Sequence, residues 1–67
     1  MKITEIIKTK ETATYEVLIS NENGIGGYIG DVFKDIEKCL KKEGHEVEVL
    51  TFMPVSNTSV MAKVKAI

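Results

Sequence analysis

One segment of this 67-residue chain has the spacing of an amphipathic helix. Its apolar residues follow one another at intervals of 4, 3, 1, 3 and 4 positions, which is one face of a 3.6-residue period: Ile25, Ile29, Val32, Phe33, Ile36 and Leu40. Gly44 comes soon after this segment, and glycine favours the left-handed conformation that ends many helices. The spacing predicts a helix that begins at Asn23 or Gly27, turns its apolar face toward a core and ends before Gly44.

Four segments around this helix alternate apolar and polar residues, which is the period-two pattern of strands. They span Lys2–Lys8, Ala13–Ser20, His45–Phe52 and Ser59–Ile67. The apolar positions of the first segment do not share one parity, so we expect a β-bulge there. The order predicts one small α+β domain over residues 1–67, a ββαββ fold with a four-stranded antiparallel sheet and one helix packed on one face. Of the two fully antiparallel strand orders, 1-2-4-3 and 2-1-3-4, we expect the first, because an irregular first strand suits an edge.

The charges of the last two strands suggest how these strands pair. If Phe52 lies opposite Ser59, Glu48 faces Lys63 on one side of the sheet while apolar residues face one another on the other side. A shift of one residue would lose all of these pairs, so we expect this register, with Glu48 and Lys63 on the outer face. The inner face, under the helix, is expected to hold Tyr15, Val17, Ile19, Val47, Val49, Val60, Ala62 and Val64.

The same register leaves apolar side chains on the outer face, which one helix does not cover. The residues expected at its centre are Leu18, Leu50, Phe52 and Met61. A chain of this length buries only about 60% of its unfolded surface, and the single cysteine, Cys39, allows no internal disulfide. Small folds without such supports are often stabilised by oligomerisation, so we expect this cluster to contact a second copy or another protein. The alternative is that apolar residues on an open sheet need no partner.

The glycine-rich stretch "NENGIGGYIGD" precedes the helix and has two interpretations. As a ligand site it would bind a small anion near Gly24, Gly26, Gly27 and Gly30, because helix N-termini attract negative charge. The spacing from Gly26 to Gly30 is one residue too long for a dinucleotide-binding loop, and Asp31 places negative charge where a phosphate would lie. We therefore expect a strand-to-helix joint, in which Gly26, Gly27 and Gly30 form a strip that allows another backbone to pack closely.

The chain offers few groups for catalysis, metal binding or nucleic-acid recognition. Cys39 is expected to be a small buried hydrophobe and His45 a solvated residue beyond the helix end, so we expect no enzyme, no metal site and no cofactor. The net charge is −1, and every basic residue is a lysine, which argues against nucleic-acid binding. No apolar run approaches the roughly 20 residues that cross a bilayer, and the first residues lack the apolar core of a signal peptide, so a cytoplasmic location is expected.

These observations favour a small non-enzymatic interaction or regulatory module that binds a protein partner and self-associates as a homodimer through the outer sheet face. One alternative is a binder of a small anionic ligand at the glycine-rich turn. A weaker one is a nucleic-acid binder that uses the lysines on the outer face of the helix.

Overall fold

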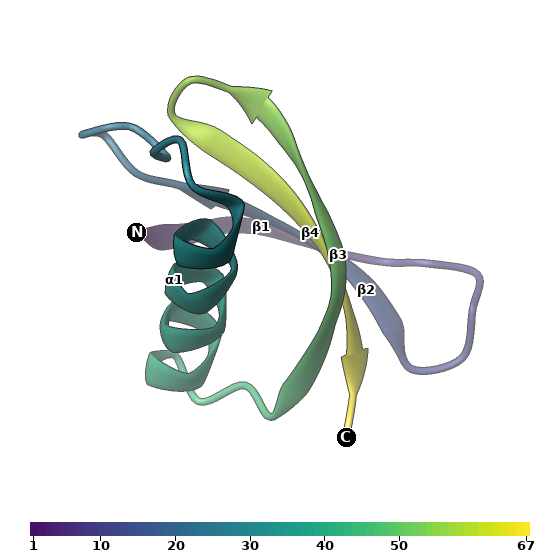
Figure 1. The fold of residues 1–67 in the computed structure, drawn as a ribbon. Coiled ribbons are helices and arrows are strands. Elements are labelled where there is room, and N and C mark those ends of the chain that lie inside the picture. The colour runs from purple at the N-terminus through teal and green to yellow at the C-terminus, as the bar shows by residue number, and fades with distance from the viewer.

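The computed structural model of the protein describes residues 1–67 and contains four strands and one helix (Figure 1). In chain order these are β1 (Lys2–Lys8), β2 (Thr14–Ser20), α1 (Ile29–Lys42), β3 (Val47–Ser56) and β4 (Ser59–Ala66). The strands form one antiparallel sheet in the order β1-β2-β4-β3, and α1 packs on one face of it. The predicted ββαββ fold and the expected strand order are both confirmed.

The core lies between α1 and the central strands β2 and β4. Val17 and Ile19 of β2 and Val60, Ala62 and Val64 of β4 are all buried, since alternate residues of each strand point toward the helix. Val49 is buried beside them, and Tyr15 and Val47 pack at the margin of the cluster. The predicted inner face is therefore confirmed. From the helix, Val32, Ile36, Cys39 and Leu40 complete the core.

The helix begins later than the sequence predicts. Tyr28 is its N-cap and Ile29 its first residue, because Gly24 and Gly26 adopt φ angles of +97° and +88°, which no right-handed helix contains. As a result Ile29 is 76% exposed, and the prediction that it reaches the core is wrong. Ile25 does pack against the core, but from the loop before the helix.

The helix ends before Gly44, as predicted, with Lys42 as its last residue. This glycine has φ +84°, and its N–H donates to the carbonyl of Lys41 at 3.0 Å. The N–H of His45 donates to the carbonyl of Leu40, also at 3.0 Å. These two bonds form a Schellman motif, which satisfies carbonyls that have no partner within the helix.

The expected bulge in the first strand is present at Thr4. Ile3 lies opposite Ile19 and Glu5 opposite Leu18, so Thr4 is the additional residue, and its hydroxyl donates to the carbonyl of Leu18 at 3.1 Å. Because of this insertion Ile3 and Ile6 both lie on the inner face, although one is at an odd and the other at an even position. Ile7 lies on the outer face.

The predicted register of the last hairpin is wrong. Phe52 lies opposite Ala62, and Lys63 lies opposite Thr51 rather than Glu48, which faces Lys65. The reason is that β3 continues to Ser56 and turns at residues 57 and 58, with bulges at Leu50 and Val55. Residues 53–56, which the predicted register leaves between the two strands, are therefore part of β3, and they include Pro54. Proline lacks an N–H, but β3 is an edge strand and one of its sides needs no ladder bonds.

The changed register moves Phe52 to the inner face. Its neighbour Ala62 is fully buried, and its ring centroid lies 6.3 Å from that of Phe33 on α1, with the planes inclined at 47°. Tilted pairs at this separation are favourable for aromatic rings. The expectation that Phe52 lies on the outer face is therefore wrong.

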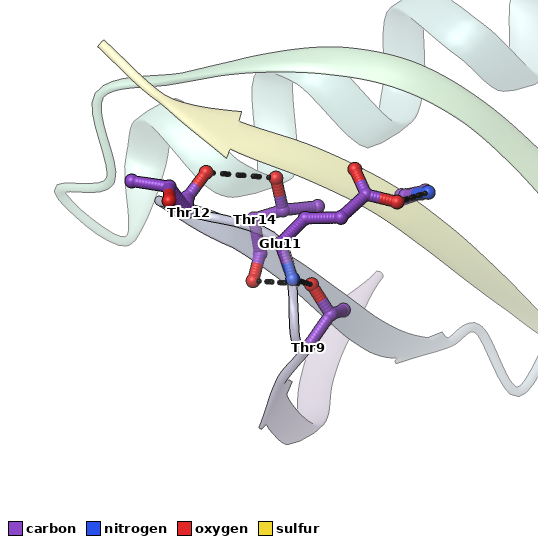
Figure 2. Close-up of polar contacts among 5 residues, drawn as sticks. Thr9, Glu11, Thr12 and Thr14 are labelled. Atoms are coloured by element: carbon purple, nitrogen blue, oxygen red, sulfur yellow. Dashed lines mark hydrogen bonds and ion pairs between the residues drawn. The ribbon is translucent and has the colours of Figure 1, made fainter.

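The turn between β1 and β2 is held by threonine side chains (Figure 2). The hydroxyl of Thr9 donates to the carbonyl of Thr14 at 3.1 Å and accepts the N–H of Glu11 at 3.2 Å. The hydroxyl of Thr14 donates to the carbonyl of Thr12 at 3.1 Å. Within this turn, Glu11 forms an ion pair with Lys63, with 3.0 Å between Oε1 and Nζ.

A pair of double-mutant cycles tests this register. Lys63→Met and Glu11→Gln should couple by at most about 1 kcal/mol in the free energy of unfolding, because the pair is partly solvated. The matched cycle of Lys63→Met with Glu48→Gln should be additive, since Glu48 faces Lys65. Urea denaturation measures both. Coupling between Lys63 and Glu48 without coupling to Glu11 would contradict the observed register.

Candidate functional site

The outer sheet face carries a row of apolar side chains that crosses three strands. Leu18 of β2 lies opposite Met61 of β4, which lies opposite Met53 of β3. We call these three residues the outer apolar row. Leu18 and Met61 are half-buried, whereas Met53 is 65% exposed, because it lies on an edge strand. No helix packs on this side of the sheet, so these side chains face outward.

The residues at the centre of the outer face differ in part from those expected from the sequence. Leu18 and Met61 are neighbours as expected, Leu50 is exposed at the bulge of β3, and Phe52 lies on the other face. Met53 replaces Phe52 in the row. Sequence reasoning missed Met53 because it placed the residue in a loop. Phe52 and Met53 are consecutive apolar residues followed by a proline, so no alternation of polar and apolar residues places Met53 in a strand.

Charged residues lie in the next row of the outer face. Ile7 of β1 lies opposite Glu16 of β2, which lies opposite Lys63 of β4. Lys63 is held by Glu11 from the β1–β2 turn, whereas Glu16 is exposed and forms no ion pair within the chain. The surface therefore combines an apolar row, which ends at Glu5 of β1 opposite Leu18, with an acidic and a basic position side by side on its two central strands.

The glycine-rich segment is a strand-to-helix joint that is hydrogen-bonded to the β3–β4 turn. The N–H of Asn21 donates to the carbonyl of Thr58 at 2.8 Å, and the N–H of Ile25 donates to the carbonyl of Asn57 at 3.0 Å. The side-chain amide of Asn21 also donates to the carbonyl of Gly24 at 2.9 Å. A β-carbon on Gly24 would lie 3.6 Å from the carbonyl oxygen of Asn57, so the two loops are in contact at this residue.

The other glycines of the segment do not form a packing strip. A β-carbon built on Gly26, Gly27 or Gly30 meets no atom within 4 Å, so the expected close approach of a backbone does not occur within the chain. The late start of α1 explains this result, since it leaves Gly30 in the first turn beside the exposed Ile29.

The charge and the shape of the surface around the glycines are relevant to the predicted anion site. Tyr28 provides no side-chain cap for the helix, but Asp31 stands in its first turn and already supplies the negative charge that this end favours. A hollow of about 650 Å³ lies nearby and is lined by Met1, Lys2, Ser20, Asn21, Glu22, Asn23 and Thr58. None of the four glycines borders it. The anionic-ligand alternative remains a prediction.

A smaller apolar hollow lies on the inner face beside the end of α1. It measures about 220 Å³ and is lined by Ile6, Tyr15, Val17, Leu40, His45, Val47 and Val64. Here α1 has ended, so the margin of the inner face is open to solvent. Its walls are almost entirely apolar, which allows packing contacts but supplies few polar groups to orient a ligand.

Cys39 and His45 occupy different environments. Cys39 is only 8% exposed, and burial raises the pKa of its thiol, because an apolar environment disfavours the thiolate. His45 is exposed at the end of the helix.

No group of three or more His, Cys, Asp or Glu side chains is placed to hold a metal ion. The single helix, α1, is not long and apolar enough to cross a membrane.

Comparisons with protein-family models, curated proteins and solved structures give no match to this chain.

Two glycine substitutions test the joint. Gly30→Ala should raise the free energy of unfolding by up to about 1 kcal/mol, because the helical site is open and alanine is the better helix former. Gly26→Ala is the matched control. It meets no atom either, but its φ of +88° should make alanine cost about 1–2 kcal/mol. Thermal and urea denaturation measure both. A loss of stability for Gly30→Ala would instead show that another backbone rests on this residue.

The buried thiol predicts a pH dependence of stability. Because the folded protein holds the Cys39 proton to higher pH than the unfolded chain, this contribution is complete below the ordinary thiol pKa of about 8.5. It is lost as the pH rises through the folded-state pKa. Urea denaturation should therefore show stability falling more steeply above pH 8.5 in the wild type than in Cys39→Ala. Equal slopes would contradict the prediction.

Proposed function

We propose that this chain is a small non-enzymatic interaction module that binds a protein through its outer apolar row. The observation that carries the proposal is the continuous row of Leu18, Met61 and Met53 on the sheet face opposite the helix. Covering such side chains removes apolar surface from water, which contributes roughly 25 cal/mol per Å². This gain in free energy is the physical reason for the outer apolar row to bind a partner.

The side chains of the row suit adaptable contact. Two of its three members are methionines, whose unbranched and polarisable chains fit irregular partner surfaces. Both central members stand on strands β2 and β4, which the core anchors from the other side. A flexible side chain on a rigid strand combines tolerance of the partner's shape with a fixed position for the whole surface.

The environments of the reactive side chains support a function without catalysis. A nucleophilic cysteine needs a thiolate and a neighbouring base, whereas burial keeps Cys39 protonated at neutral pH. His45 is an exposed residue beyond the helix end. A cytoplasmic location belongs to the same proposal, and an unpaired buried thiol is compatible with that reducing compartment.

Site-specific photocrosslinking in the native cell tests the proposal. A photoreactive amino acid at Met53 should give protein adducts of discrete mass, because this residue is the exposed end of the row. The same amino acid at Lys38, an exposed position of α1, is the matched control and should give none. Gel separation and mass spectrometry detect the adducts formed at each of the two positions.

A second variant distinguishes specific contact from chance collision. Leu18→Lys places a charge in the middle of the row and should lower the yield at Met53 at least about tenfold, since burying an unpaired charge costs well over 1.4 kcal/mol. Circular dichroism checks that this variant is folded. Equal adducts at Met53 and Lys38, or adducts unaffected by Leu18→Lys, would reject the proposed surface.

A further inference from the structure

The ladder between β2 and β4 has a symmetry in its outward side chains. On one level of the sheet Leu18 lies opposite Met61, and on the next outward level Glu16 lies opposite Lys63. On these two levels each central strand presents one apolar and one charged residue, and the two charges are opposite in sign. On the following level β4 carries a further lysine, Lys65, opposite Thr14 of β2. A surface of this kind is complementary to itself when a two-fold axis runs along the strands between β2 and β4.

From this register we infer that the partner of the outer apolar row is a second copy of the chain, packed face to face about that axis. This inference rests on the proposed function and names its partner. The rotation places Leu18 over Met61 of the partner subunit and Glu16 over Lys63 of the partner subunit. Each contact occurs twice, as in any isologous interface.

The charges select this arrangement over the other face-to-face one. A two-fold axis across the strands, through the apolar row, would place Glu16 over Ser20 of the partner subunit and Glu5 over Glu5 of the partner subunit, a like-charge contact. The axis along the strands pairs Glu16 with a lysine and places Glu5 over Met53 of the partner subunit, at the margin of the face. Desolvating an unpaired charge is costly, whereas pairing it recovers part of that cost. Glu16 has no ion pair within its own chain, and Glu11 holds Lys63 in place on the face.

The edges of the sheet favour contact through the face. β1 is interrupted by the bulge at Thr4, and β3 by bulges at Leu50 and Val55 and by Pro54. Bulges and proline on edge strands hinder the pairing of one sheet edge with another. The β2–β4 ladder, in contrast, pairs without a register shift from Thr14 to Ser20, so its outer face is regular.

The size of the face sets the strength of the dimer. Four strands about 4.8 Å apart and about seven residues long, at about 3.4 Å per residue, give roughly 450 Å² per copy. Stable interfaces bury about 800 Å² per partner, so this contact is at the weak end. We therefore expect a dimer that dissociates at micromolar to millimolar concentrations and weakens as salt screens the charge pairs.

Charge reversal with mixing tests the inference. Glu16→Lys gives two like-charge contacts across the axis, and Lys63→Glu does the same with the opposite sign. Each variant alone should weaken the dimer at least about tenfold in Kd, because like charges opposed at an interface are strongly unfavourable. A mixture of the two should dimerise as tightly as the wild type to within about threefold, because the heterodimer has two attractive contacts.

Sedimentation equilibrium at low salt from roughly 10 µM to 1 mM measures the dimers, and native mass spectrometry of an isotopically labelled mixture identifies the heterodimer. If Lys63→Glu does not fold because it loses Glu11, the double variant Glu11→Lys/Lys63→Glu restores that pair and takes its place in the mixture.

Wild-type protein that stays monomeric at 1 mM, or a mixture no tighter than the single variants, would overturn the inference. Discrete adducts of Met53 to a different protein, together with a monomeric wild type, would leave the proposed function standing and remove only the second copy as partner. Adducts of twice the chain mass, with rescue in the mixture, would support both.

Discussion

The contact between one short helix and the inner face of the central strands is the interaction on which the rest of this structure depends. A helix of 14 residues is about 21 Å long and buries Val32, Ile36, Cys39 and Leu40 against β2 and β4. Each fully buried aliphatic side chain contributes roughly 1.5–3 kcal/mol, so this layer is the main source of stability. A single helix serves only one face of the sheet, and the other face is left to solvent or to a partner.

The positions of the β-bulges are related to this contact between the helix and the sheet. The central ladder between β2 and β4 is regular, and all the register shifts lie on the edge strands β1 and β3. A bulge changes which face of the sheet the following side chains occupy, as the bulge at Thr4 does for Ile6 and the bulge at Leu50 does for Phe52, which both lie on the inner face. The regular centre and the interrupted edges together direct the proposed association to the sheet face.

The loop before the helix shows how backbone conformation overrides helical periodicity. Ile25 and Ile29 have the spacing of a helical face, but the left-handed glycines between β2 and α1 hold this part of the chain in a joint. Two backbone bonds then fasten the joint to the β3–β4 turn. Ile25 still reaches the core, and Ile29 remains exposed because the helix has only just begun.

Much of the fold was predictable because its signals are local. The helical spacing of Val32, Ile36 and Leu40, the stop at Gly44 and the alternation of the strands all depend on residues close in sequence. The mixed parity of the first strand even indicated its bulge. The strand order was predictable as well, since so few orders keep four strands antiparallel in a ββαββ chain.

The tertiary structure alone decided the register of the last hairpin and with it the composition of the outer face. The charges of Glu48 and Lys63 suggested one pairing, but exposed ion pairs are worth at most about 1 kcal/mol. The observed register packs the partly buried Phe52 against Phe33, and partial burial of such a side chain together with an aromatic contact contributes on the order of 1–3 kcal/mol. Lys63 forms its ion pair with Glu11 instead. The sequence by itself determined which elements form and which residues fill the core. Packing between distant elements determined which side chains remain on the outer face, because a bulge costs little locally and reverses the direction of every side chain that follows it.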